Sequence, residues 1–177
     1  MSSFDFEGRI TDIVDYPKPG VVFKDITTLL KDPDGFEATI DAIAERFKDA
    51  GVTKVVGAEA RGFMIGAPVA YRLHAGFVPA RKPGKLPREV RSESYDLEYG
   101  SDELQIHADA IDPDDVVLIV DDLVATGGTA EAQAKLIKQF GASLAGMGFL
   151  MELAFLNPRQ AIAKVTDADV FSLVQVH

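Results

Sequence analysis

The sequence contains no cysteine, and its three histidines stand far apart in the chain. Without thiols, neither disulfide bonds nor thiolate metal sites can form. Isolated histidines lack the close spacing of zinc ligands, so His74, His107 and His177 are expected to be surface or packing residues. The lack of cysteine is also typical of a cytoplasmic protein, and the cytoplasm is the location we expect.

Long apolar runs and a surplus of basic residues are also missing. No apolar stretch approaches the roughly 20 residues of a transmembrane helix, and residues 1–7 lack the basic and apolar regions of a signal peptide. We therefore expect no membrane partner. The 18 lysines and arginines are outnumbered by 28 aspartates and glutamates, which gives a net charge of −10. This charge argues against nucleic-acid binding, which requires a basic surface.

The sequence does contain a regular alternation of strand and helix patterns. Buried strands are predicted at residues 54–58, 76–80, 116–120, 142–152 and 169–174. Helices are predicted from residue 33 to a point before Gly51, at residues 63–73 and 129–140, and from residue 158 onward. Strands that alternate with helices indicate a mainly parallel sheet with right-handed crossovers. We expect a single α/β domain over residues 1–177, with helices flanking the central sheet.

Three segments fall outside this alternation. Residues 3–13 are predicted to form a short helix, which the proline-rich residues 16–20 end. Residues 95–99 and 103–107 alternate on either side of a glycine turn and predict a β-hairpin. Residues 82–94 have no periodicity and predict a long polar loop, which a compact domain carries only for a reason.

The most informative stretch is Val116–Ala130. Five apolar residues lead to Asp121 and Asp122, and a small, hydroxyl-bearing loop then opens a helix; the loop consists of Ala125, Thr126, Gly127, Gly128 and Thr129. The N–H groups at a helix N-terminus bind phosphate, and glycines let the backbone approach it closely. The pattern lacks the lysine of a nucleotide P-loop and the spacing of a dinucleotide fingerprint, which favours a compact terminal phosphate.

Two aspartates beside a phosphate site must have a role other than phosphate binding, because their negative charge repels phosphate. Paired carboxylates suit the vicinal hydroxyls of a ribose or a magnesium ion. Ribose 5-phosphate would therefore satisfy both halves of Val116–Ala130. The alternative is a surface acidic pair followed by an ordinary glycine turn.

Val116–Ala130 resembles the phosphoribosyl-pyrophosphate signature of the type I phosphoribosyltransferases. Residues 16–26, 59–63, 81–87 and 95–100 resemble the remaining motifs of the adenine-specific branch of that family, in the same order. The resemblance implies the type I phosphoribosyltransferase fold, with residues 1–30 as a base-binding hood and residues 82–99 as a flexible catalytic loop. It also implies a Mg²⁺-dependent reaction of purine salvage, in which adenine and phosphoribosyl pyrophosphate give AMP and pyrophosphate.

A phosphate substrate in an acidic protein requires a local basic cluster. Residues 81–91 carry five cationic side chains against the single acid Glu89. A run of charge is usually solvated surface, but the length and the one-sided charge of this segment favour a function. By resemblance, Arg81, Lys82 and Lys85 contact pyrophosphate, partly across the interface of a homodimer, and the loop closes over the reaction to exclude water.

The resemblance assigns the remaining roles. Arg61 binds pyrophosphate and takes part in catalysis, and Glu98 takes or relays the proton as N9 bonds to C1′. Adenine lies between Phe23 and Leu153, while backbone groups around Val22 and Lys24 read its amino edge. An arginine paired with Glu59, an exposed strand-edge glutamate and ordinary core packing are the corresponding alternatives. Magnesium is expected on the donor substrate, so no protein ligand for it is predicted.

Two other functions stay open at this point. The first is a phosphoribosyltransferase for another purine, such as xanthine or hypoxanthine. The second is a regulator of the same fold that binds the donor without turning it over. A regulator of this kind would carry a DNA-binding module, and the sequence has no spare helix-turn-helix segment for one.

Overall fold

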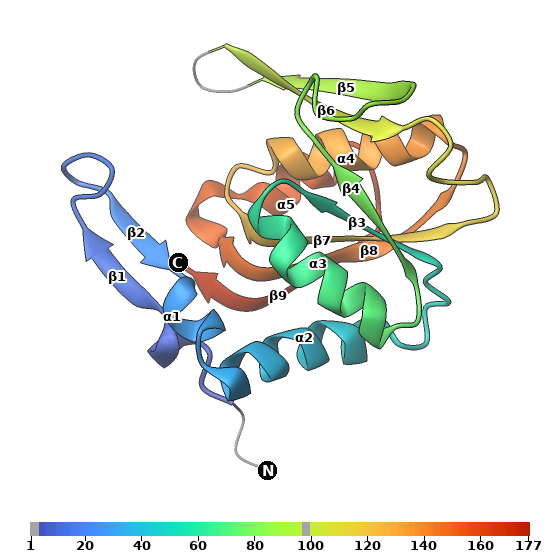
Figure 1. Cartoon of the computed structure of the whole chain (residues 1–177). Helices are drawn as coiled ribbons and strands as arrows, with labels where there is room; N and C mark the ends of the chain where they lie inside the picture. Colours follow the sequence, from blue (N-terminus) through green and yellow to red (C-terminus); the bar gives the residue numbers. More distant parts are fainter. Residues whose placement is uncertain (1–3, 97–99) are drawn as a thin grey trace.

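The computed structural model describes residues 4–96 and 100–177, and it has a five-stranded parallel sheet at its centre (Figure 1). The strands lie in the order β4 (Gly76–Ala80), β3 (Lys54–Ala58), β7 (Val116–Val124), β8 (Ser143–Leu153) and β9 (Asp169–Val176). All four pairings between neighbours are parallel. The predicted α/β fold with a central parallel sheet is therefore confirmed.

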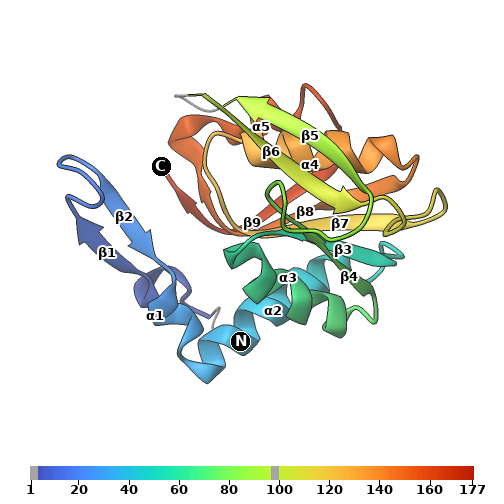
Figure 2. The ribbon, with the colours of Figure 1, turned by 45° about the horizontal axis from the view of Figure 1, so that its top comes forward.

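Helices cover both faces of the sheet (Figure 2). One face carries α1 (Thr27–Leu30), α2 (Pro33–Phe47) and α3 (Arg61–Arg72). The other carries α4 (Gly128–Gln139), α5 (Pro158–Ile162) and the hairpin of β5 (Val90–Asp96) and β6 (Ser101–His107). Successive side chains of a strand point to opposite faces, so the sheet divides the core in two. Val117 and Ile119 pack on the α4 side, and Leu118 and Val120 pack on the α2 and α3 side.

A second hairpin stands beside the sheet, formed by β1 (Thr11–Val14) and β2 (Val22–Asp25) (Figures 1 and 2). Two 3₁₀ turns complete the elements, η1 (Glu7–Arg9) before this hairpin and η2 (Ala154–Leu156) after β8. Within the described ranges, no helix is long and apolar enough to cross a membrane.

Three boundary predictions are wrong. The described part of the predicted helix 3–13 is instead a 3₁₀ turn at Glu7–Arg9 followed by β1, because Thr11–Val14 pairs with β2. The predicted loop 82–94 becomes strand at Val90, because β5 pairs with β6 from Val90 opposite His107 onward. The central strand does not end at Val120, since β8 continues beside it and pairs as far as Val124.

Candidate active site

The carboxyl ends of β3 and β7 bring the predicted polar residues together. A cavity of about 250 Å³ opens there, and its lining comes from six segments of the chain: Ala58, Glu59, Ala60, Arg61, Lys82, Tyr95, Leu104, Asp121, Asp122, Leu123 and Thr129. A second cavity of about 110 Å³ adjoins it and contains the whole predicted loop Ala125–Thr129. Asp121, Leu123 and Thr129 line both cavities, so the two form one continuous candidate site.

The acidic pair is buried, contrary to the simple reading of two aspartates at an open edge. Only 9 % of Asp121 and 5 % of Asp122 is exposed, because both lie within β7. The backbone N–H of Asp122 donates a 2.8 Å hydrogen bond to Oδ1 of Asp121. Burial raises the pKa of Asp121 well above its usual range, and the neighbouring charge of Asp122 raises it further. Asp121 therefore takes up a proton more readily than a surface aspartate does.

Arg61 reaches the pair from the first turn of α3. Its Nε lies 3.0 Å from Oδ2 of Asp122, and about half of the arginine side chain remains exposed to the cavity. That Oδ2 is buried and accepts no hydrogen bond from the described residues, so its 3.0 Å contact with Arg61 is an ion pair.

The predicted phosphate loop leads directly into α4 through a glycine in the left-handed conformation. Gly127 has a φ of +95° and lies in the middle of the loop, one residue before α4 begins. A Cβ atom on Gly127 would lie 2.9 Å from the carbonyl oxygen of Pro158 and 3.0 Å from Cβ of Ala161, both in α5. Only glycine fits this position, because the left-handed conformation and the close packing both exclude a side chain.

The basic side chains predicted for pyrophosphate are held by carboxylates of other segments. Glu59 lies 3.4 Å from Arg81 and 3.2 Å from Lys85, and it also accepts a 2.5 Å hydrogen bond from the backbone N–H of Lys82. The side chain of Lys82 pairs with Asp102. The count of one acid among residues 81–91 therefore missed the partners that the fold supplies.

Burial opposes ionisation of Glu59, but the hydrogen bonds from Lys82 and Lys85 and the charge of Lys85 outweigh it and lower its pKa. A carboxyl whose pKa is depressed by folding stabilises the protein above its unfolded pKa, and this stabilisation is lost as the pH falls through the folded pKa.

We therefore expect Glu59→Gln to lower the melting temperature at pH 7 by roughly 2–4 °C, which corresponds to about 1 kcal/mol in a chain of this size. The difference from wild type should shrink as the pH falls below about 4.5, the ordinary pKa of a glutamate. Thermal unfolding followed by circular dichroism between pH 3.5 and 7 measures both. A difference that stays constant over this range would contradict the ionic role of Glu59.

Two further residues at the site were not singled out for it by the sequence. The hydroxyl of Tyr95 donates to Oδ2 of Asp102 at 3.2 Å, and its ring lies 3.7 Å from where a Cβ of Gly128 would stand. Burial raises the pKa of Tyr95, which keeps its hydroxyl a donor. Gln133 lines the smaller cavity and is fully buried, and neither polar atom of its side chain has a partner among the described residues. The sequence could have indicated Gln133, because it is a polar residue on the apolar, inward face of the predicted helix 129–140.

The residues predicted to bind adenine lie in two segments, and no described contact connects these segments. Val22, Phe23 and Lys24 lie in β2, where the Phe23 ring meets Tyr16 edge-on at 5.3 Å between centroids. Leu153 ends β8 and packs partly buried on the α2 side. A cavity of about 180 Å³ between this hairpin and the sheet is lined by Lys24 with Met151 and Val176, and neither Phe23 nor Leu153 contributes to it. The sandwich of Phe23 and Leu153 stays a prediction.

Glu98 lies outside the described residues, since it belongs to the segment 97–99. Its predicted role in proton transfer is therefore untested by the structure. Among the residues that are described, no group of three or more histidine, aspartate or glutamate side chains could hold a metal ion.

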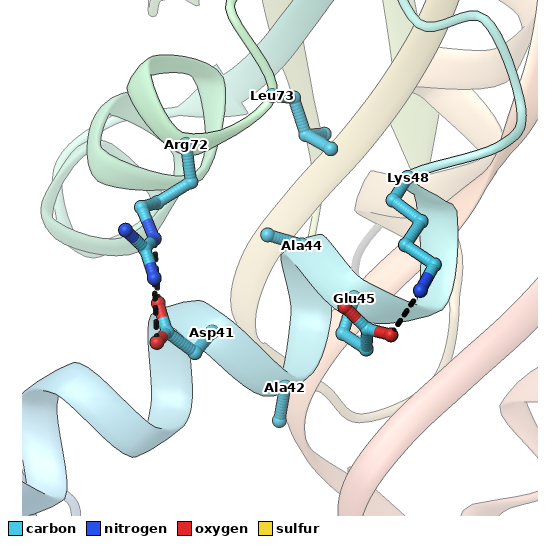
Figure 3. A pocket seen from close by; sticks show the side chains of 7 residues that line it. All are labelled: Asp41, Ala42, Ala44, Glu45, Lys48, Arg72 and Leu73. Carbon is cyan, nitrogen blue, oxygen red and sulfur yellow. Dashed lines mark hydrogen bonds and ion pairs between the residues drawn. The ribbon is translucent and has the colours of Figure 1, made fainter.

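A larger cavity of about 440 Å³ lies elsewhere, between α2 and the end of α3 (Figure 3). Its charged side chains are already paired, Arg72 with Asp41 and Lys48 with Glu45. None of the predicted site residues lines it. Size alone therefore does not identify the site in this protein.

Comparison with known proteins agrees with this geometry. The phosphoribosyl transferase domain family matches residues 25–175. The adenine phosphoribosyltransferase of Desulfitobacterium hafniense is 55 % identical over 175 residues, which cover 99 % of each chain. The solved structure of the Rhodothermus marinus adenine phosphoribosyltransferase is 45 % identical, with a TM-score of 0.89 over 97 % of this chain and 96 % of the other. That of Saccharomyces cerevisiae, in complex with adenine and an imino-altritol bisphosphate, is 38 % identical, with a TM-score of 0.87 over 95 % and 96 %.

Proposed function

The chain belongs to the phosphoribosyl transferase family, and on that premise we propose that it transfers the 5-phosphoribosyl group of phosphoribosyl pyrophosphate to N9 of adenine. The products are AMP and pyrophosphate, and the reaction is one of purine salvage. The observation that carries this function is the continuity of the two cavities: a loop suited to a phosphate adjoins two buried carboxylates and a half-exposed arginine at one sheet edge. A ribose that carries phosphate at one end and pyrophosphate at the other matches this order.

The roles of the side chains follow from their positions. The loop Ala125–Thr129 holds the 5-phosphate through N–H groups and hydroxyls. Asp121 and Asp122 hold the ribose hydroxyls, since both carboxylates line the cavity beside the loop. Arg61 and Lys82 face the same cavity and bind the pyrophosphate.

The same cations prepare the site for its leaving group. In this proposal Arg81, Lys82 and Lys85 exchange their carboxylate partners for pyrophosphate oxygens when the donor binds. The charge that develops at C1′ as pyrophosphate departs resembles the oxocarbenium ion of glycoside hydrolysis. The protein then supplies position and charge, and no covalent nucleophile is needed. Glu98 would take or relay the proton released from N9.

Magnesium, in this proposal, enters with the donor. The acidic pair does not fit a resident Mg²⁺, because a guanidinium already lies 3.0 Å from Asp122 and burial favours the protonated form of Asp121. The oxygens of pyrophosphate and ribose remain as its ligands. The homodimer and the cytoplasmic location expected from the sequence complete the proposal.

The direct test supplies each purine base with phosphoribosyl pyrophosphate and Mg²⁺ and follows nucleotide formation by ultraviolet absorbance. We expect AMP from adenine and at least about 100-fold lower kcat/KM for hypoxanthine and xanthine, whose 6-oxo group cannot donate to backbone acceptors. Preference for a 6-oxo purine would overturn the adenine assignment. Tight donor binding without any nucleotide product would instead favour a regulator.

A further inference from the structure

An ion pair between the buried Glu152 and the half-exposed Arg159 has no part in the mechanism above. Glu152, the penultimate residue of β8, has a side chain that is only 3 % exposed. Its Oε1 accepts a 2.8 Å hydrogen bond from Nε of Arg159, and its Oε2 accepts bonds of 2.8 Å from both the Arg159 NH2 group and Ser172. Burial raises the pKa of Glu152, but the bonds from Arg159 and Ser172 and the charge of Arg159 outweigh burial and lower it.

Arg159 connects three elements through this pair. Arg159 is the second residue of α5, and its guanidinium donates hydrogen bonds to Glu152 in β8. Its NH1 group also donates a 2.8 Å hydrogen bond to the carbonyl of Val170 in β9. A helix of five residues is too short to be stable by itself in water. The position of α5 therefore depends on anchors such as this one.

The helix α5 in turn packs against the phosphate loop. The space where Gly127 would carry a Cβ is filled by the carbonyl of Pro158 and the methyl group of Ala161. Pro158 and Arg159 are adjacent in sequence, so a shift of the Arg159 anchor moves the atoms that contact Gly127. The loop must hold its N–H groups at fixed positions to bind phosphate, and small displacements weaken such binding strongly.

We propose that Glu152 and Arg159 are positioning residues for the 5-phosphate: the pair fixes α5, and α5 fixes the left-handed turn at Gly127. The inference rests on the proposed function for the identity of the phosphate. It predicts that a substitution in the pair weakens binding of the phosphate end of the donor and leaves adenine binding nearly unchanged.

The experiment compares Arg159→Lys with Arg72→Lys. Arg72 forms a similar two-bonded pair with Asp41 (Figure 3) and is about half exposed like Arg159, but it ends α3 and lines neither cavity of the site. We expect Arg159→Lys to raise the KM for phosphoribosyl pyrophosphate at least tenfold and to change the KM for adenine less than twofold. Arg72→Lys should change neither. Ser172→Ala, which removes one bond to Glu152, serves as a milder variant should Arg159→Lys fold poorly, and should give a smaller rise of the same kind.

A second readout does not depend on catalysis. Ribose 5-phosphate should raise the melting temperature of the wild type and of Arg72→Lys, and raise that of Arg159→Lys by less than half as much. If protection by ribose 5-phosphate and the donor KM are the same in Arg159→Lys as in wild type, the inference is overturned. If the wild type forms no AMP but Arg159→Lys still loses this protection, the positioning role stands and the proposed reaction fails.

Discussion

Replacement of Asp122 by asparagine is expected to lower kcat/KM for phosphoribosyl pyrophosphate by about 100-fold, which corresponds to about 2.7 kcal/mol. The substitution keeps the shape of the side chain and removes its charge. It converts a carboxylate that lines the proposed ribose site into a group that can present an amide nitrogen there, and it removes the counter-charge 3.0 Å from Arg61. Hydrogen bonds to charged groups contribute about 1.5–3 kcal/mol each, so the loss of one of them accounts for this effect.

The stability of this variant should not fall with its activity. Asp121 and Asp122 are adjacent and buried, and their mutual repulsion contributes to the raised pKa of Asp121. Removal of one charge relieves that repulsion, so the melting temperature of Asp122→Asn should equal or exceed that of wild type. We expect Asp122→Asn to lose activity because its contact with the donor is changed, while the fold stays stable. A lower melting temperature would point to a structural role of Asp122.

Steady-state kinetics with each substrate varied in turn measure the effect. The KM for adenine should stay within about twofold, because in our proposal the base binds at the hairpin and at Leu153. Asp109→Asn is the matched control, since Asp109 is an exposed aspartate that pairs with Arg88 and lines neither cavity of the site. Unchanged donor kinetics in Asp122→Asn would reject the ribose assignment.

The parts of this site that the sequence predicts are those that depend on local pattern. Strand 54–58 has continuous apolar character because both of its faces are buried, and the structure places it at the same residues. The loop Ala125–Thr129 is also local, since its glycines and hydroxyls directly precede the helix that completes it.

The parts that the sequence does not predict depend on partners far along the chain. Glu59 holds Arg81 and Lys85 across more than 20 residues, and Asp102 reaches Lys82 only because β5 and β6 pair. The burial of Glu152 is equally hidden, because an acid near a strand end is by default a surface residue. Pairing register and burial are properties of the assembled fold, and no periodicity in one segment encodes them.

Replacement of Gly127 by alanine is expected to have the largest structural effect at the site. A left-handed conformation costs an alanine about 1–2 kcal/mol, and the contacts at 2.9 Å and 3.0 Å with α5 add a similar amount through overpacking. Together we expect a loss of about 3 kcal/mol, or roughly 6–12 °C in melting temperature for a chain of this size. The same displacement should lower kcat/KM for phosphoribosyl pyrophosphate more than about 100-fold, because the loop N–H groups no longer point at one phosphate.

Alanine substitutions at two other glycines separate the cost of the left-handed conformation from the cost of overpacking. Gly84 also has a positive φ, of +79°, but a Cβ there meets no described atom within 4 Å, so Gly84→Ala measures conformational strain alone. Gly128 lies in the same loop as Gly127, but its nearest neighbours would be at 3.7 Å, an ordinary contact, and alanine suits a helix better than glycine does. Thermal unfolding should therefore rank the three variants with Gly127→Ala lowest, Gly84→Ala next and Gly128→Ala closest to wild type. If Gly127→Ala melts no lower than Gly84→Ala, then α5 yields to the added methyl group, and the loop does not depend on that helix for its shape.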